Sequence, residues 1–374
     1  MNNVNFLPKI YSIFLEKGKV SWQAPSNIAL IKYWGKYGEQ LPKNASLSFT
    51  LSQSHTRTTV LYEKKNSADF SFEVYLEGKR ETAFEPKILK FFERIEPYVP
   101  FLKQYAFKIE TSNSFPHSSG IASSASGMSA LACCLVSMEH SMVSPSVVEG
   151  SYLKQKSLQE VSTALDQTRK ASFLARLGSG SACRSIEGPL VVWGNHPHIE
   201  GSSDLIGIKY PNKVHKNFEN YQDTILLVDK GEKQVSSTVG HNLMHDHPFA
   251  EQRFKQANEN LSKLIPVLES GDLSTFIQIV ESEALSLHAM MLTSNPYFIL
   301  MKPNTLEIIN RIWNFRKETS SHVCFTLDAG ANVHVLYPEA EKEVVLNFIK
   351  KELVPFCKNG EFIQDCTGTG AKKL

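Results

Sequence analysis

A run of small residues that leads directly into an apolar segment constrains this chain more than any other feature. Residues 116–127 read PHSSGIASSASG, and the apolar residues 128–138 that follow are typical of a helix. The first turn of a helix has unpaired N–H groups and the positive end of the helix dipole, so it attracts anions. Small residues let a phosphate approach the backbone, and the hydroxyls of Ser123 and Ser124 can add hydrogen bonds. The segment therefore predicts a site for a phosphate-bearing ligand.

A flexible loop that only caps a helix would have the same composition, so this run by itself leaves both interpretations open. The chain contains no GxxxxGK[ST] sequence, which excludes a Walker-type phosphate loop. Positive charge for a bound phosphate must therefore come from other parts of the chain.

The composition describes an ordinary globular protein that is long enough for two domains. Its 374 residues are 42% hydrophobic and 21% charged, and the net charge of +2 does not favour nucleic acid or an acidic membrane as a partner. Six cysteines occur without a Cys-x-x-Cys pair, which predicts buried free thiols in a reducing cytoplasm. Residues 1–19 lack the features of a signal peptide, and no segment reaches membrane-spanning length, so we expect a cytoplasmic protein.

Hydrophobic periodicity predicts strands and helices that do not alternate strictly, which favours an α+β fold. A cluster of Gly, Asn, His and Pro suggests a break, and we expect an N-terminal domain over residues 1–195 and a C-terminal domain over 196–374. The expected strands are 24–34, 45–51, 56–62, 69–75, 189–193, 224–228, 324–327 and 333–337. The expected helices are 88–95, 128–138, 147–176, 249–268, 273–291, 303–315 and, as the last element, 339–353.

Three further clusters carry side chains suited to anion chemistry. Residues 27–36 read NIALIKYWGK and place two lysines and a tyrosine at the end of an apolar strand. Residues 178–185 read GSGSACRS, and the guanidinium of Arg184 can bind a carboxylate or phosphate with two hydrogen bonds. Asp328 stands at a strand end, where it could act as a base or orient a substrate. Each has a structural alternative: a solvated lysine loop, a helix C-cap with a surface ion pair, and a turn cap.

Histidines offer little support for a metal centre. His241, His245 and His247 lie close together, and His196 and His198 flank a proline. Because there is neither a cysteine pair nor a His-Glu-x-x-His sequence, we expect no zinc site.

In combination, the four segments resemble the mevalonate diphosphate decarboxylases, a branch of the GHMP kinase superfamily. The similarity spans about 24–337, and the YWGK and GSGSACRS segments are specific to the decarboxylase branch. The resemblance implies a GHMP-kinase-like two-domain architecture, with an ATP-binding N-terminal domain and a ferredoxin-like C-terminal domain. It also implies an active site in the cleft between the domains, and a homodimer.

The family's reaction is the ATP-dependent decarboxylation of mevalonate 5-diphosphate to isopentenyl diphosphate. ATP, with Mg²⁺ bridging its phosphates, would phosphorylate the tertiary 3-hydroxyl, and the new phosphate would leave as carbon dioxide departs. Such a site must hold three anionic groups and orient one hydroxyl, so positioning and electrostatics should dominate. Relatives that accept the monophosphate, that phosphorylate mevalonate without decarboxylation, or that only sense a ligand share most of this framework.

The resemblance also implies roles for individual residues. Asp328 would orient or deprotonate the 3-hydroxyl, and Lys32 would lie near the transferring phosphate. Arg184 would bind the substrate carboxylate and the neighbouring diphosphate, steadied by a hydrogen bond with Asn27. Further substrate contacts are expected from Tyr33, Lys36, Ser179, Ser181, Ser236 and Ser237, and contacts with ATP from Pro116, Gly120, Ala122, Ser123 and Ser124.

The chain departs from the family pattern at a few positions that bear on substrate choice. These are HSS at 117–119 in place of Thr-Ala-Ala, Tyr37 and Gly38 in place of Arg-Asp, Ala331 in place of Pro, and a tail, 366–374, with no obvious counterpart. Lys36, Arg184 and both serines near Arg184 are retained, which favours the diphosphate as substrate.

Overall fold

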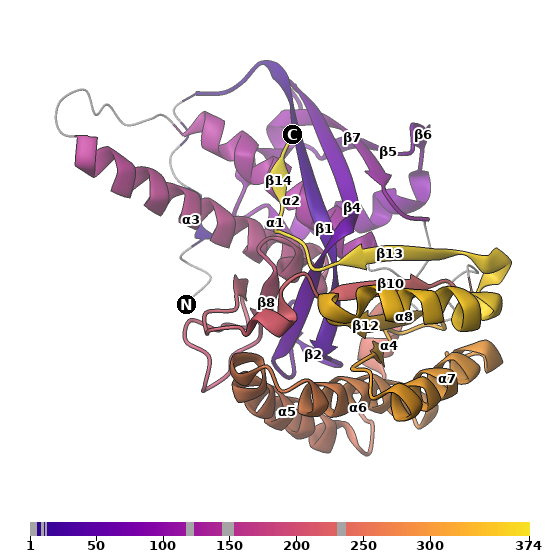
Figure 1. Ribbon diagram of the computed structural model, residues 1–374. Coiled ribbons are helices and arrows are strands. Elements are labelled where there is room, and N and C mark those ends of the chain that lie inside the picture. The colour runs from indigo at the N-terminus through magenta and orange to yellow at the C-terminus, as the bar shows by residue number, and fades with distance from the viewer. Residues whose placement is uncertain (1–5, 9–10, 12, 117–122, 144–152, 230–236) are drawn as a thin grey trace.

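The computed structural model describes residues 6–8, 11, 13–116, 123–143, 153–229 and 237–374. Within these ranges the strands form an eight-stranded sheet, a four-stranded sheet and a small two-stranded one (Figure 1). The strands are β1 (Lys17–Ile31), β2 (Lys36–Tyr37), β3 (Leu41–Pro42), β4 (Ser46–Lys64), β5 (Ser71–Leu76), β6 (Lys79–Arg80), β7 (Tyr105–Asn113), β8 (Leu190–Trp193), β9 (Gly207–Lys209), β10 (Gln222–Leu226), β11 (Cys324–Thr326), β12 (Val333–Tyr337), β13 (Phe362–Cys366) and β14 (Lys372–Lys373).

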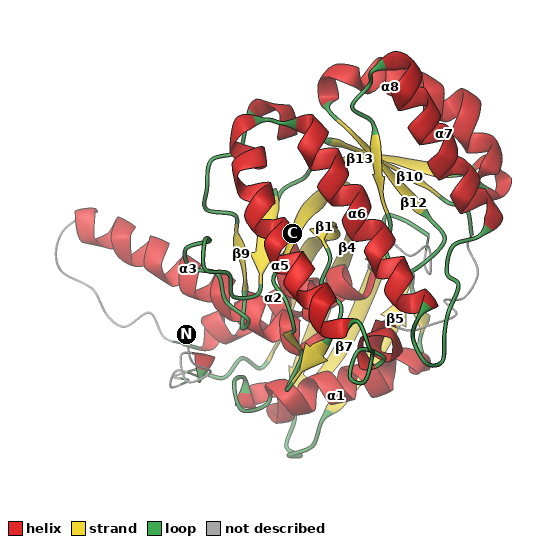
Figure 2. Cartoon of the chain, turned by 90° about the horizontal axis from the view of Figure 1, so that it is seen from below, coloured by secondary structure: helices red, strands yellow, loops and turns green. Residues whose placement is uncertain are grey.

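The helices form layers against the two larger sheets. They are α1 (Glu85–Ile95), α2 (Ser123–Met142), α3 (Leu153–Gly178), α4 (Ser237–Asn242), α5 (Ala250–Ser270), α6 (Leu273–Leu292), α7 (Pro303–Thr319) and α8 (Lys342–Phe348), with a short 3₁₀ helix, η4 (Gly180–Ser185). Figure 2 shows α5 and α6 crossing the region where the two sheets meet.

The large sheet has the order β14-β1-β4-β7-β5-β6, with β8 and β9 attached to β4. Its pairs are antiparallel except β5 with β7. Helix α2 packs on β1 and β4 and is covered in turn by α3. Because α2 lies between sheet and helix, it is buried along most of its length, and its Ala, Ser and Cys side chains allow close packing.

The four-stranded sheet has the order β11-β12-β10-β13 and is antiparallel throughout. Apolar side chains from β10, β11 and β12 form one core with α7 and α8. The other face carries Asp223, His334 and Thr326, and the Thr326 hydroxyl donates to the Ala29 carbonyl of β1 at 3.4 Å. The same face also carries Ile225, Cys324 and Leu336, so the second sheet meets the first through a buried face that is partly polar and partly apolar.

Strand β4 is irregular where the two sheets meet. Its pairing with β1 shifts between Pro25 and Asn27, so residues 51–54 leave the regular ladder. Asp365 of β13 accepts the freed N–H groups: Oδ1 from Ser52 and Gln53 at 2.8 Å each, and Oδ2 from Ser54 at 2.7 Å. Because buried N–H groups need acceptors, one carboxylate both completes β4 and joins the sheets.

The C-terminal tail continues from β13 back to the first sheet. The Gly368 N–H donates to the Thr50 carbonyl at 2.8 Å, the Ala371 N–H donates to the Ile186 carbonyl at 2.9 Å, and β14 then pairs with β1. A Cβ on Gly368 would lie 2.6 Å from the Leu51 carbonyl oxygen, so only glycine fits this crossing. The tail is thus part of both halves of the molecule (Figure 1).

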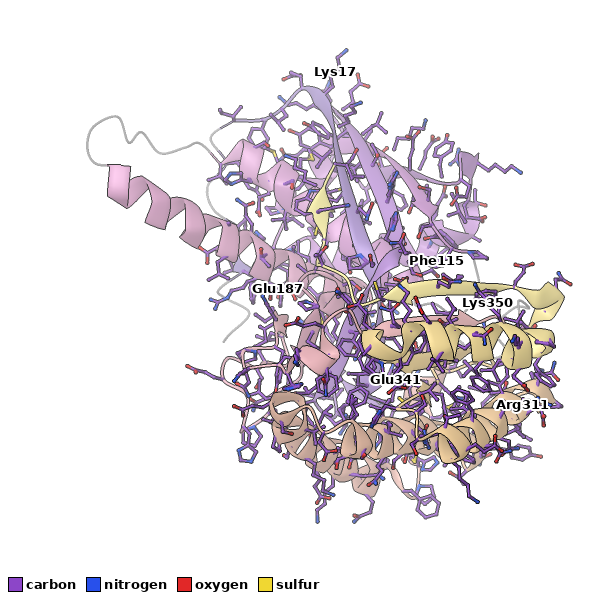
Figure 3. The ribbon with its side chains drawn as sticks, viewed as in Figure 1. Lys17, Phe115, Glu187, Arg311, Glu341 and Lys350 are labelled. Carbon is purple, nitrogen blue, oxygen red and sulfur yellow. The ribbon has the colours of Figure 1, made fainter. Side chains whose placement is uncertain are left out.

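Apolar packing also crosses between the halves. Phe115, labelled in Figure 3, follows β7 and lies in a hydrophobic cluster that Ile363 of β13 packs against. The same cluster contains Leu30 of β1, Phe49 of β4 and Val280 of α6. Side chains from the two parts of the chain therefore share one core at the junction.

The structure confirms the expected α+β fold and changes several elements. The predicted strands 45–51 and 56–62 form one strand, β4, because the β4 backbone continues through the irregular segment. The prediction that a helix over 339–353 ends the pattern was wrong, since β13 and β14 follow it. Strand β7 was also missed, although Tyr105, Phe107 and Ile109 alternate on one buried face.

The remaining expectations about the fold concern the cysteines, the domain boundary and membrane-spanning segments. Five cysteines are buried and free, whereas Cys366 is only partly buried. The domain boundary between residues 195 and 196 stays a prediction. None of the helices in the described part of the chain is both long and apolar enough to cross a bilayer.

Replacing Asp365 with Asn should lower the free energy of unfolding by about 1–3 kcal/mol. The amide has one acceptor oxygen in place of two, and its NH₂ group would face a backbone N–H that needs an acceptor. Urea unfolding would measure the loss. The exposed Asp246→Asn substitution is the control and should change stability by less than about 0.5 kcal/mol. Equal stability of the two variants would contradict the role given to Asp365.

Candidate active site

An ion pair between the two halves of the chain lies at the centre of the site. Lys32 is the first residue after β1 and Asp328 follows β11, 296 residues later. The Lys32 ammonium donates to Asp328 Oδ1 at 3.0 Å. The Lys32 side chain is 3% exposed and that of Asp328 35%, so the pair opens to solvent on the carboxylate side. Burial lowers the pKa of Lys32, and the charge of Asp328 opposes that shift.

Arg184 is a second buried cation close to this pair. It lies in η4 and is 4% exposed, and its guanidinium lies over the Tyr33 ring, 5.2 Å from the centroid. Its Nε and Nη1 atoms make no hydrogen bond to any described residue. Burial lowers the pKa of Arg184, and Tyr33 and Asp328 act in the opposite direction. A buried guanidinium with two unused donors fits an anionic ligand such as a carboxylate or phosphate.

The expected hydrogen bond between Asn27 and Arg184 is absent from the described residues. Asn27 Nδ2 donates instead to the Ser185 hydroxyl at 2.8 Å and to the Ser181 carbonyl at 3.4 Å. The tight turn of η4 places Ser185 against β1, while its neighbour Arg184 extends over Tyr33. Asn27 therefore anchors η4 itself. Its buried Oδ1 accepts no hydrogen bond from any residue that the structure describes.

Lys36 extends the positive region. It begins β2, and its ammonium donates to Gln40 Oε1 at 2.6 Å. Burial lowers the pKa of Lys36 to about 8, and the charges of Lys87 and Arg94 on α1 add to the shift. We missed Lys87 and Arg94 in the sequence because charges opposite the apolar face of an amphipathic helix look like an ordinary solvated surface.

Gly180 allows η4 to approach the lysine segment closely. A Cβ at this position would lie 2.7 Å from Trp193 Cη2, 3.2 Å from the Tyr33 hydroxyl and 3.4 Å from Lys36 Cε. Ser179 and Ser181, on either side of it, are partly buried. The small residues of GSGSACRS thus bring Tyr33, Lys36 and Arg184 together.

His241 of α4 also reaches the site. Its ring stacks on Tyr33 with centroids 4.7 Å apart and lies 4.6 Å from the Trp34 ring, and Nδ1 accepts the Gly35 N–H at 3.0 Å. Burial, with Lys36 and Arg184 nearby, lowers its pKa well below the ordinary value, so the ring stays neutral with its proton on Nε2. The sequence shows His241 only as one of three nearby histidines and gives no sign of this stacking. Among the described residues, no group of three metal-ligating side chains converges.

The expected nucleotide residues are only partly described. Helix α2 begins at Ser123, five residues before the apolar segment, so Ser123 and Ser124 occupy its first turn. The Lys87 ammonium donates to the Ser124 hydroxyl at 3.0 Å, which brings a cation to this helix end. Pro116 is exposed; Gly120, Ala122 and Ser236 lie outside the described residues, and Ser237 is described only as the start of α4.

Domain families match both halves of the chain. The diphosphomevalonate decarboxylase-like N-terminal domain matches residues 24–204, and the mevalonate 5-diphosphate decarboxylase C-terminal domain matches 224–372. The second match includes most of the tail, 366–374, so the expectation that this tail has no counterpart is wrong. The site residues Lys32, Arg184 and Asp328 all lie within the matched ranges.

Individual relatives agree with these matches. Diphosphomevalonate decarboxylase of Aspergillus fumigatus is 30% identical over 348 residues, covering 89% of this chain and 80% of the relative. That of Saccharomyces cerevisiae is 30% identical, covering 86% and 78%. Mevalonate diphosphate decarboxylase structures from Enterococcus faecalis (27% identical, 96% and 99% covered) and Staphylococcus aureus (25% identical, 96% and 98%) superpose with TM-scores of 0.76 and 0.77. On these grounds, the chain belongs to the diphosphomevalonate decarboxylase family of ATP-dependent decarboxylases.

Proposed function

We propose that this protein converts mevalonate 5-diphosphate to isopentenyl diphosphate, carbon dioxide and inorganic phosphate, with hydrolysis of ATP to ADP. The observation that carries the proposal is an excess of buried positive charge. Lys32 and Arg184 lie close to the Asp328 carboxylate, Lys36 and Arg184 both lie close to His241, and the neighbouring Glu283 is paired with Arg253. Such an excess suits a substrate with a carboxylate and a diphosphate, because buried cations need anionic partners.

Each group of the substrate has a counterpart in the site. The unused donors of Arg184 suit the carboxylate and the adjoining diphosphate oxygens, and Lys36 suits the diphosphate. Asp328, the partly exposed member of its ion pair, suits the 3-hydroxyl and would orient it or accept its proton. Lys32 then lies beside the oxygen to which the phosphoryl group is transferred and would stabilise the developing charge.

The first turn of α2 suits the phosphates of ATP, and Mg²⁺ would bind through those phosphates. Ser123, Ser124 and the Lys87 ammonium offer donors at the positive end of this helix, as phosphate binding requires. Mg²⁺ is commonly held by substrate phosphates and one or two carboxylates, so it needs no dedicated cluster of ligands; when bound, it offsets the charge of the phosphates. A similar solved structure, 28% identical with a TM-score of 0.76, is a complex with MVAPP, AMPPCP and magnesium.

The decarboxylation follows from phosphorylation of the tertiary alcohol. A hydroxyl is a poor leaving group, whereas a phosphate is a good one. When the C–O bond to this phosphate breaks, carbon 3 becomes electron-deficient, and the electron pair of the breaking bond to the carboxylate forms the new double bond as carbon dioxide leaves. The task of the protein is to position these groups and to balance their charges.

Incubation with ATP, Mg²⁺ and one of three acids should identify the substrate. With mevalonate 5-diphosphate we expect equal amounts of carbon dioxide and ADP, and with mevalonate or its 5-phosphate much less of both. Carbon dioxide mainly from the monophosphate would indicate a phosphomevalonate decarboxylase, and ADP without carbon dioxide a 3-kinase. Binding of the diphosphate without any turnover would indicate a sensor and refute the proposal.

Asp328→Asn should lower kcat by about 10²–10⁴-fold while nucleotide affinity changes by less than about threefold, because the amide cannot accept the hydroxyl proton. Initial rates of carbon dioxide release and calorimetric titration with an ATP analogue would measure the two effects. If the variant keeps more than a tenth of the wild-type kcat, Asp328 does not have the role assigned to it.

Affinity for inorganic diphosphate should fall as the pH rises from 7 to 9. Lys36 has its pKa lowered to about 8, so it is charged below that pH and neutral above it. At pH 7 the wild type should bind roughly tenfold more tightly than Lys36→Met, and the difference should vanish above about pH 9. Comparing the two proteins by calorimetry at each pH cancels the titration of the ligand. The exposed Lys79→Met substitution is the control, and a pH-independent ratio would exclude Lys36 from the diphosphate site.

A further inference from the structure

A fully buried ion pair lies directly behind Lys32. Glu283 of α6 is 0% exposed and Arg253 of α5 is 4% exposed. The guanidinium donates through Nη1 to Oε1 at 2.9 Å and through Nη2 to Oε2, and Asn260 Nδ2 donates to Oε1 at 2.7 Å. Both carboxylate oxygens are therefore engaged, which a charge at this depth requires.

This pair holds the backbone of Lys32. Glu283 Oε2 accepts the Lys32 N–H at 2.8 Å, and Arg253 Nη2 donates to the Lys32 carbonyl at 3.4 Å. Asn44 Nδ2 donates to the same carbonyl at 3.0 Å. Because β1 ends at Ile31, the ladder no longer supplies partners at Lys32, and side chains from α5 and α6 replace them.

We infer that Arg253 and Glu283 are positioning residues that fix the orientation of Lys32 in the reaction. The inference rests on the proposed function. A buried ion pair contributes little net stability compared with apolar residues of the same size. The contacts of Arg253 and Glu283 with Lys32 therefore explain the presence of this pair better than a contribution to stability does. Since both helices belong to the second half of the chain, the pair makes the placement of Lys32 depend on the docking of α5 and α6 against β1.

The pair also affects the charge on Lys32. Burial and Arg184 lower the pKa of Lys32, whereas Asp328 and Glu283 raise it. His288 of α6 also lies close to Lys32 and Asp328, but burial lowers its pKa to about 4, so it is neutral between pH 6 and 10. Removing the Glu283 charge leaves Arg253 as an unpaired cation close to Lys32. Both changes lower the pKa of Lys32, so it should lose its proton at a lower pH.

Helix α6 offers a matched control. Glu281, two residues before Glu283, accepts hydrogen bonds from Arg316 at 2.7 and 3.1 Å and from Trp313 Nε1 at 2.9 Å. It thus makes the same kind of two-pronged arginine pair with one further donor, but its partners lie on α7 and none of these contacts reaches Lys32. A purely structural role would give Glu281→Gln and Glu283→Gln similar effects.

The test compares three variants by steady-state kinetics between pH 6 and 10. Glu283→Gln should lower kcat at least tenfold, change KM for either substrate by less than about threefold, and move the alkaline limb of the kcat profile down by about one pH unit. Arg253→Lys keeps the buried pair but loses the donor to the Lys32 carbonyl, so kcat should fall while the alkaline limb stays in place. Glu281→Gln should keep the wild-type kcat and profile.

Amide hydrogen exchange of the peptide that contains Lys32 gives a readout that needs no turnover. Exchange should be faster in Glu283→Gln than in Glu281→Gln. This expectation does not depend on turnover. If the wild type releases no carbon dioxide, only the proposed function is refuted. If Glu283→Gln does not fold, Arg253→Lys decides the question. Equal exchange in the two glutamine variants, or a folded Arg253→Lys with wild-type kcat, overturns the inference.

Discussion

Positive charge buried beside the end of β1 is the constraint on which the rest of the site depends. Lys32 is almost fully enclosed, and burial lowers its pKa while the carboxylates of Asp328 and Glu283 raise it. Asp328 meets its side chain and Glu283 its backbone, and both come from the second half of the chain. Arg184 adds a second enclosed cation whose donors are only partly used. An anionic ligand would therefore complete the electrostatics of the site.

The same junction is where the two sheets are joined. The irregular segment of β4 presents N–H groups that Asp365 accepts, and the tail crosses from β13 to β1 past Ile186, two residues after Arg184. Backbone hydrogen bonds thus hold η4, β4 and the second sheet in one arrangement. A site assembled from remote segments needs such a framework, because an error of about 1 Å in the placement of a reacting group is costly.

Sequence reasoning was most successful where function requires particular residue types in a short segment. The segments NIALIKYWGK and GSGSACRS and the aspartate at a strand end each suggest a particular chemistry, and the structure brings their Lys32, Arg184 and Asp328 together. The Asn27–Arg184 hydrogen bond was expected from resemblance alone and was wrong, because the direction in which a side chain leaves a 3₁₀ turn depends on its packing. His241 was noticed only for its neighbours in sequence, since nothing local shows that it stacks on Tyr33.

Local patterns were enough to predict an α+β chain and a set of cationic segments suited to phosphate. Those properties depend on residue type, periodicity and glycine content, which are all local. The tertiary structure alone decided that β4 is one strand, that a two-residue tail strand closes the first sheet, and that Glu283 and Arg253 hold Lys32. Each of these features depends on a hydrogen bond between a backbone group that lacks a local partner and a residue hundreds of positions away. A local sequence pattern contains no information about such a contact.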